Sequence, residues 1–170
     1  MYQANYLNNE HNRVPGNTPL GSSYIVENRH SNQFNALFNS MLNHRINNIM
    51  SLQAGISFNY TKASYFKTVR DLLGGEYWLD VDKFAERDFP DNPQMLQNDL
   101  NNPNRKVQKG DRFGYDYDIY AVKANAWIQN MITLPQWDIN YGFNVSYTQF
   151  FRDGNMRNGH APDNSYGKGE

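Results

Sequence analysis

A group of aromatic and acidic residues in the middle of the chain has the side chains needed to bind a small solute. Large planar side chains provide contact area at a low entropic cost, and neighbouring carboxylates would add contacts to a sugar or a cation. We therefore predict that the ligand-contacting residues are Tyr77, Trp78, Asp80, Tyr115 and Tyr117. The alternative is a structural role, because a loop this long must bury some aromatic side chains to be ordered.

The sequence gives little reason to expect a catalytic site or a metal-binding site. The chain has no cysteine, and its four histidines lie too far apart for a metal-binding motif such as H-E-x-x-H. Oxygen-rich loops suit Ca²⁺, yet no D-x-[DN]-x-[DN]-G spacing occurs. No nucleophile lies beside a base in a recognisable motif. We therefore expect no enzymatic activity, no metal site and no cofactor.

The elements that would position the aromatic and acidic residues are strands with one apolar and one polar face. In residues 137–151, WDINYGFNVSYTQFF, apolar and polar residues alternate, and successive side chains on a strand point to opposite faces. Trp137 and Tyr147 lie about 33 Å apart at a rise of ~3.3 Å per residue, or roughly 25 Å apart along the membrane normal at a ~40° tilt, as in outer-membrane barrels. The predicted lipid-facing residues are Trp137, Ile139, Tyr141, Phe143, Val145 and Tyr147.

A second segment, residues 49–61, shows the same alternation over the same length. Its predicted lipid-facing residues are Met50, Leu52, Ile56, Phe58 and Tyr60. Two further strands are predicted near residues 33–42 and 120–133. Their alternation is less regular, because Leu37 and Met41 interrupt the polar face of one and Asn130 interrupts the apolar face of the other.

Turn-forming residues divide these four strands into two hairpins, separated by a long loop over residues 62–119. Within that loop we expect two short helices, one over residues 81–87 capped by Asp80 and one over residues 93–100 that follows Asn92. The predicted fold is all-β. Residues 1–170 would form part of an antiparallel transmembrane β-barrel with about four strands and a long extracellular loop bearing short helices. Four strands cannot close a barrel.

Composition narrows the class of protein further. The formal net charge of −1 gives no reason to expect a nucleic-acid partner. Hydrophobic residues make up 39% of the chain, and no apolar run reaches the ~18 residues of a transmembrane helix. The N-terminal sequence MYQANYLNNEHN lacks the basic and apolar regions of a signal peptide. Because an outer-membrane protein needs export, we expect the chain to be a piece of a longer protein.

Several stretches resemble TonB-dependent outer-membrane receptors of the Bacteroidetes type. They are QFNALFNSML, DLLGGEYWLDVDKFAERDFPDN, QNDLNNPNR, GDRFGYDYDIY and FRDGNMRNGHAPDNSYGKGE. The resemblance implies a piece from the middle of the barrel, with long loops outside the cell, that helps to import a scarce solute such as a siderophore, vitamin, peptide or glycan. It also implies lipid contact, coupling to the periplasmic TonB protein through an N-terminal region that is absent here together with the plug domain, and a surface lipoprotein as a further partner.

A different class of protein accounts for the same pattern. In a soluble or surface β-rich module, the alternating strands would form a core of two sheets, and the long loop would bind a glycan. The aromatic residues at both ends of 137–147 favour two lipid interfaces over a single core.

Overall fold

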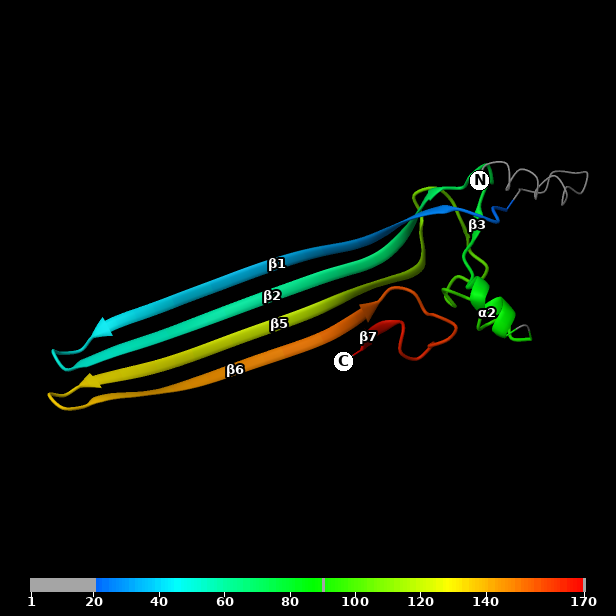
Figure 1. Ribbon diagram of the computed structural model, residues 1–170. Coiled ribbons are helices and arrows are strands. Elements are labelled where there is room, and N and C mark those ends of the chain that lie inside the picture. Colours follow the sequence, from blue (N-terminus) through cyan, green and yellow to red (C-terminus); the bar gives the residue numbers. More distant parts are fainter. Residues whose placement is uncertain (1–20, 90, 170) are drawn as a thin grey trace, which may run out of the picture. The chain divides into compact units, whose positions relative to one another are not determined.

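The computed structural model describes residues 21–89 and 91–169, apart from the side chains of Glu86 and Arg87. Its main element is a sheet with the strand order β1-β2-β5-β6-β7 (Figure 1). The strands and the helix, in chain order, are β1 (Val26–Arg45), β2 (Met50–Asp71), β3 (Trp78–Leu79), α2 (Lys83–Asp88), β4 (Lys106–Val107), β5 (Arg112–Thr133), β6 (Asp138–Gly154) and β7 (Gly167–Gly169). The sheet is antiparallel, which confirms the predicted all-β class.

The four long strands extend beyond their predicted bounds. β2 continues to Asp71 and β5 begins at Arg112, so the loop between them covers residues 72–111 and is shorter than the predicted 62–119. The sequence hid the extension of β2 because both of its faces mix polar with aromatic or apolar residues over residues 62–71, which removes the contrast on which alternation depends. Residues 112–119 do alternate between aromatic or apolar and mostly charged residues, but that segment was assigned to the long loop. β1, β2, β5 and β6 have 20, 22, 22 and 17 residues, whereas most strands of globular proteins have about 3–10.

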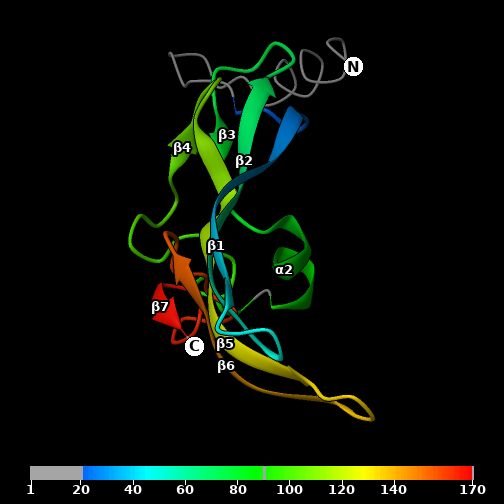
Figure 2. The same ribbon diagram turned by 90° about the vertical axis from the view of Figure 1, so that its left-hand side faces the viewer.

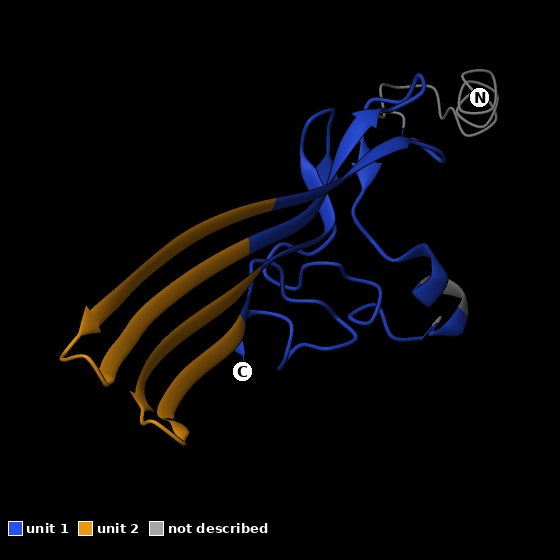
Figure 3. Cartoon of the chain, turned by 60° about the vertical axis from the view of Figure 1, so that its left-hand side comes forward, with its two compact units in different colours: residues 1–32, 63–118, 152–170 blue, residues 33–62, 119–151 orange. Residues whose placement is uncertain are grey.

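The chain divides into two compact units (Figure 3). Unit 2 comprises Gln33–Lys62 and Ile119–Phe151 and contains both short turns. In the second turn, Leu134 N–H donates to Trp137 O at 2.8 Å, which leaves Pro135 and Gln136 as a two-residue hairpin loop. In the first turn, Ile46 N–H donates to Met50 O at 3.0 Å.

One face of unit 2 is apolar and open to the surroundings. Trp137 is 70% exposed, Phe143 69% and Tyr147 58%, and the remaining predicted lipid-facing residues Ile56, Phe58, Ile139, Tyr141 and Val145 are exposed as well. Met50, Leu52 and Tyr60 are partly buried. A shallow groove crosses this face at small side chains of neighbouring strands, including Ala54 and Ala126. The face carries more exposed apolar surface than a water-facing sheet normally has.

A row of aromatic rings crosses the apolar face of unit 2. Phe34 of β1 lies 6.4 Å from Tyr60 of β2, Tyr60 lies 6.4 Å from Tyr120 of β5, and Tyr120 lies 4.7 Å from Phe151 of β6, measured between ring centroids. Each ring comes from a different strand, so the row follows from cross-strand register. Lys62 Nζ lies 5.4 Å from the centroid of Tyr120.

The opposite face of unit 2 is mostly polar. Asn125 Nδ2 donates to Asn144 Oδ1 at 2.9 Å, and Gln129 Nε2 donates to Asn140 Oδ1 at 2.8 Å, so the amides pair between β5 and β6. Trp127 lies over Gly55 on this face. A Cβ built at Gly55 would lie 2.5 Å from Trp127 Nε1, so this position requires glycine as long as the indole stays in place.

Unit 1 contains, among the described residues, 21–32, 63–118 and 152–169. Its hydrophobic core is small and consists of Val69, Val107 and Phe113, with Leu72 and Trp78 packed against it. The loops of this unit lie around the ends of β2 and β5 (Figure 2). Leu73, Val81, Ala85 and Met156 of these loops are also buried, and backbone hydrogen bonds between the loops add to this small apolar area.

The helical predictions were wrong in detail. Helix α2 begins after Asp82, whose carboxylate accepts hydrogen bonds from the N–H groups of Phe84 and Ala85. Asp82 is therefore the N-cap, and the predicted cap, Asp80, is buried elsewhere. The second predicted helix, over residues 93–100, is a series of turns. Asn92 Oδ1 does accept a hydrogen bond from Gln94 N–H at 3.2 Å, but no helix propagates from it.

Candidate ligand-binding site

The short hairpin of β3 and β4 places Trp78 within the core of unit 1. Trp78 pairs with Val107 and Leu79 pairs with Lys106. Because Val107 is fully buried against Val69 and Phe113, Trp78 packs partly buried against the same three residues. Tyr77, the residue before it, lies elsewhere: Lys106 Nζ is 4.6 Å from the centroid of its ring. The structure thus gives Trp78 a packing role.

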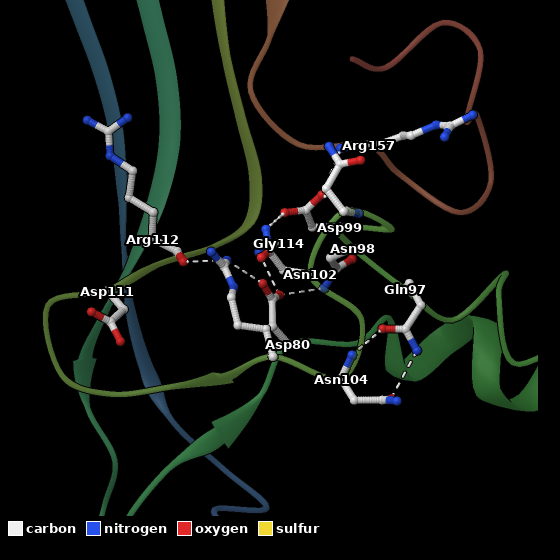
Figure 4. A network of polar contacts seen from close by, with 12 residues as sticks. Asp80, Gln97, Asn98, Asp99, Asn102, Asn104, Asp111, Arg112, Gly114 and Arg157 are labelled. Carbon is white, nitrogen blue, oxygen red and sulfur yellow. Dashed lines mark hydrogen bonds and ion pairs between the residues drawn. The ribbon is translucent and has the colours of Figure 1, made fainter. Parts of the chain in front are cut away.

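Asp80 is the centre of a buried polar network (Figure 4). Its side chain is only 1% exposed. One carboxylate oxygen accepts from Asn98 Nδ2 at 2.8 Å and from Gly114 N–H at 2.9 Å. The other accepts from Arg105 Nη2 at 2.6 Å. A buried charge requires such partners. The network ties the loop to β5, and this carboxylate is not accessible to a solute.

Further polar contacts hold two loops of unit 1 together. The side chain of Gln97 donates to Asn104 Oδ1 at 3.1 Å and accepts from Asn104 N–H at 2.7 Å. Asp99 Oδ1 accepts from Arg157 N–H at 3.1 Å, which joins residues 93–104 to the loop after β6. Gly159 sits against this loop, since a Cβ there would lie 2.0 Å from the carbonyl oxygen of Gln94.

Tyr115 and Tyr117 lie together on β5, with their ring centroids 5.9 Å apart, whereas the sequence analysis placed them in the long loop. Three residues that the sequence analysis missed join them from neighbouring strands. Tyr65 stacks on Tyr117 at 5.4 Å, Lys67 Nζ lies 5.3 Å from the ring of Tyr115, and the Arg152 guanidinium lies 4.7 Å from the ring of Tyr117. We call Tyr65, Lys67, Tyr115, Tyr117 and Arg152 the tyrosine cluster.

Gly114 sets the backbone between Phe113 and Tyr115. Its φ of +75° is a conformation that favours glycine. A Cβ there would also meet Lys67 Cδ at 3.5 Å. Since Gly114 N–H is bonded to Asp80, the buried network positions the residue from which the tyrosines of β5 follow. Asp80 is therefore connected to the predicted site through the backbone.

Glu27 carries the carboxylate that contacts the tyrosine cluster within the described chain. Its Oε2 lies 3.2 Å from Lys67 Nζ, and its Oε1 lies 2.6 Å from Arg29 Nε. Partial burial alone would raise the pKa of Glu27. The hydrogen bonds from Arg29 and Lys67 outweigh that effect and hold the pKa below its ordinary value. The same contact raises the pKa of Arg29.

Two other carboxylates of the same region, those of Asp116 and Asp82, are used within the protein. Asp116 is buried, pairs with Arg112 Nη1 at 2.8 Å and accepts from Asn155 Nδ2 at 3.2 Å. Asp82 caps α2 and lies 3.6 Å from His160 Nε2. Among the described side chains, no three His, Asp or Glu residues come together as a metal site would require.

Comparison with known proteins adds no relative. No family model, curated protein or solved structure matches this chain. Over residues 21–89 and 91–169, no helix is both long enough and apolar enough to cross a membrane.

Proposed function

We propose that the chain supplies four membrane-spanning strands and extracellular loops to an outer-membrane receptor that imports a scarce solute. The observation that carries the proposal is the aromatic row Phe34–Tyr60–Tyr120–Phe151 at one end of the exposed apolar face. Aromatic side chains are enriched where barrel strands pass from hydrocarbon to the polar interface. A basic residue, Lys62, lies beside this row, as expected near lipid headgroups.

The length of the apolar face supports the same reading. Tyr60 and Met50 are the ends of the apolar set on β2, about 33 Å apart at ~3.3 Å per residue. At a tilt of ~40° that distance corresponds to roughly 25 Å of membrane thickness, the height of the apolar band in outer-membrane barrels. The polar face with paired amides would then line the water-filled interior.

A soluble module with a two-sheet core explains these features less well. Such a core needs a second sheet packed over the apolar face. In the described residues, unit 2 contains segments of β1, β2, β5 and β6 and no further strand. Phe143 and Trp137 accordingly remain about two-thirds exposed, at 69% and 70%.

Energy coupling is the part of the proposal that rests on sequence resemblance. The resemblance to TonB-dependent receptors implies that the periplasmic TonB protein drives import. A surface lipoprotein would assist in solute capture. Neither partner is needed for the membrane-spanning role of the four strands.

Cysteine labelling tests the proposed orientation, because this chain has no cysteine of its own. Gln94 is exposed in the long loop and Gln136 is exposed in the two-residue turn. In cells that produce the complete protein, an impermeant thiol reagent should label Gln94→Cys on intact cells. It should label Gln136→Cys only after the outer membrane is permeabilised. Equal labelling of both on intact cells would favour the surface module, and labelling of Gln136→Cys alone would reverse the orientation.

A further inference from the structure

The charge around the tyrosine cluster is opposite to what the acidic sequence suggested. Lys67 and Arg152 lie over the rings of Tyr115 and Tyr117. Two carboxylates of the same stretch of sequence, Asp80 and Asp116, are buried and pair with Arg105 and Arg112 instead.

Glu27 leaves the cluster positive. It contacts Lys67 and Arg29, whereas Arg152 contacts the Tyr117 ring and two backbone carbonyls. The formal charge of these four residues is +3 − 1 = +2. Arg29 is well exposed, with 71% of its side chain accessible, and extends the positive region into solvent.

Arg152 is also held in place for binding. Its Nη1 donates to the carbonyl oxygens of Asn164 and Ser165, both at 3.1 Å. These two bonds fix the guanidinium over Tyr117. A guanidinium whose orientation is fixed loses less entropy when it binds an oxyanion than a free side chain does.

We infer that the tyrosine cluster binds a ring-shaped solute that carries an oxyanion, such as an acidic sugar. The three tyrosine rings are partly buried against one another and leave the rest of their surface for contact with a sugar or aromatic ring. Arg152 and Lys67 provide charge-assisted hydrogen bonds to a carboxylate or phosphate. The inference names the class of solute that the proposed receptor would import. Transport of that solute rests on the proposed receptor function. The binding reaction itself can be measured separately.

Ligand-observed NMR on the complete protein in detergent micelles tests the inference. The probes are D-glucuronate, D-glucose 6-phosphate and D-glucose, which share a sugar ring and differ in the oxyanion. At least one of the two anions should bind about tenfold more tightly than D-glucose, since hydrogen bonds to charged groups are stronger than those between neutral groups. Added salt should weaken binding of the anion.

Two variants identify the residues responsible. Arg152→Gln and Lys67→Gln should each weaken binding of the anion, Arg152→Gln by about tenfold. Lys106→Gln is the matched control, because Lys106 also lies over a tyrosine ring, that of Tyr77, outside the cluster. It should leave binding unchanged.

Three results would overturn the inference: equal binding of the anions and D-glucose, no binding of either anion, or equal losses in Lys106→Gln and in the two cluster variants. Any of these, with the cysteine-labelling pattern of Gln94 and Gln136 intact, would reject the solute class and leave the proposed receptor role standing. Selective anion binding together with a failed labelling pattern would reject the receptor role and leave the solute class standing.

Discussion

Replacement of Phe143 by arginine tests whether this side chain faces lipid or water. Phe143 is 69% exposed on the apolar face of β6. It is six residues from Trp137 and four from Tyr147 in the sequence, or roughly 15 Å and 10 Å along the membrane normal at ~3.3 Å per residue and a ~40° tilt. In the proposed barrel, that places it near the bilayer midplane. An arginine there costs about 2–4 kcal/mol, which reduces the folding equilibrium constant roughly 30- to 700-fold.

The neighbouring residue is the control. Asn144 lies on the opposite face and accepts one hydrogen bond, from Asn125 Nδ2. Asn144→Arg removes that bond and should cost no more than ~1.5 kcal/mol. The free energy of unfolding of the complete protein, measured by urea titration in phosphatidylcholine vesicles, gives both values. Equal losses, or a neutral Phe143→Arg, would refute the assignment of the two faces.

Three further predictions concern unit 1. Asp80→Asn removes the carboxylate that pairs with the partly exposed Arg105 and should cost about 1–3 kcal/mol, seen as faster proteolysis of residues 72–111; unchanged cleavage would contradict the network. Trp78→Ala should cost about 2–4 kcal/mol by opening a cavity against Val69 and Val107. If the variant loses ligand binding while the loop stays resistant to protease, Trp78 contacts the ligand instead. Because the pKa of Glu27 is lowered in the folded state, its contribution to stability is present above its unfolded pKa of 4.5 and is lost as pH falls through the lower folded pKa. Glu27→Gln should therefore be less stable than wild type near neutral pH, and this difference should shrink on acidification through that range; a difference that does not change with pH would refute the pairing.

The central parts of two long strands could be predicted from the contrast between their faces. Alternation in residues 49–61 and 137–151 indicated strands with one apolar face, because lipid or a core on one side and water on the other select different residues at a period of two. The two hairpin turns followed from Leu134-Pro135-Gln136 and from the asparagines at 47 and 48.

Cross-strand neighbours could not be predicted in the same way. Tyr65, Lys67 and Arg152 join Tyr115 and Tyr117 only through the register of β2, β5 and β6, and register is a property of pairing that no single strand contains. Asp80 was expected to cap a helix or to contact a ligand. Its burial depends on Arg105 and Gly114, which come from distant parts of the chain.

Quenching of single tryptophans by brominated lipids tests the central claim, contact between lipid and one face of the sheet. The chain has three tryptophans, and each has a different environment: Trp137 on the apolar face, Trp127 over Gly55 on the polar face, and Trp78 against the core of unit 1. Single-tryptophan variants of the complete protein are placed in vesicles whose lipids carry bromine near the headgroup end of the acyl chains. Strong quenching of Trp137 with little quenching of Trp127 and Trp78 is the predicted result. Quenching of Trp127 equal to that of Trp137, or none of Trp137, would contradict the claim.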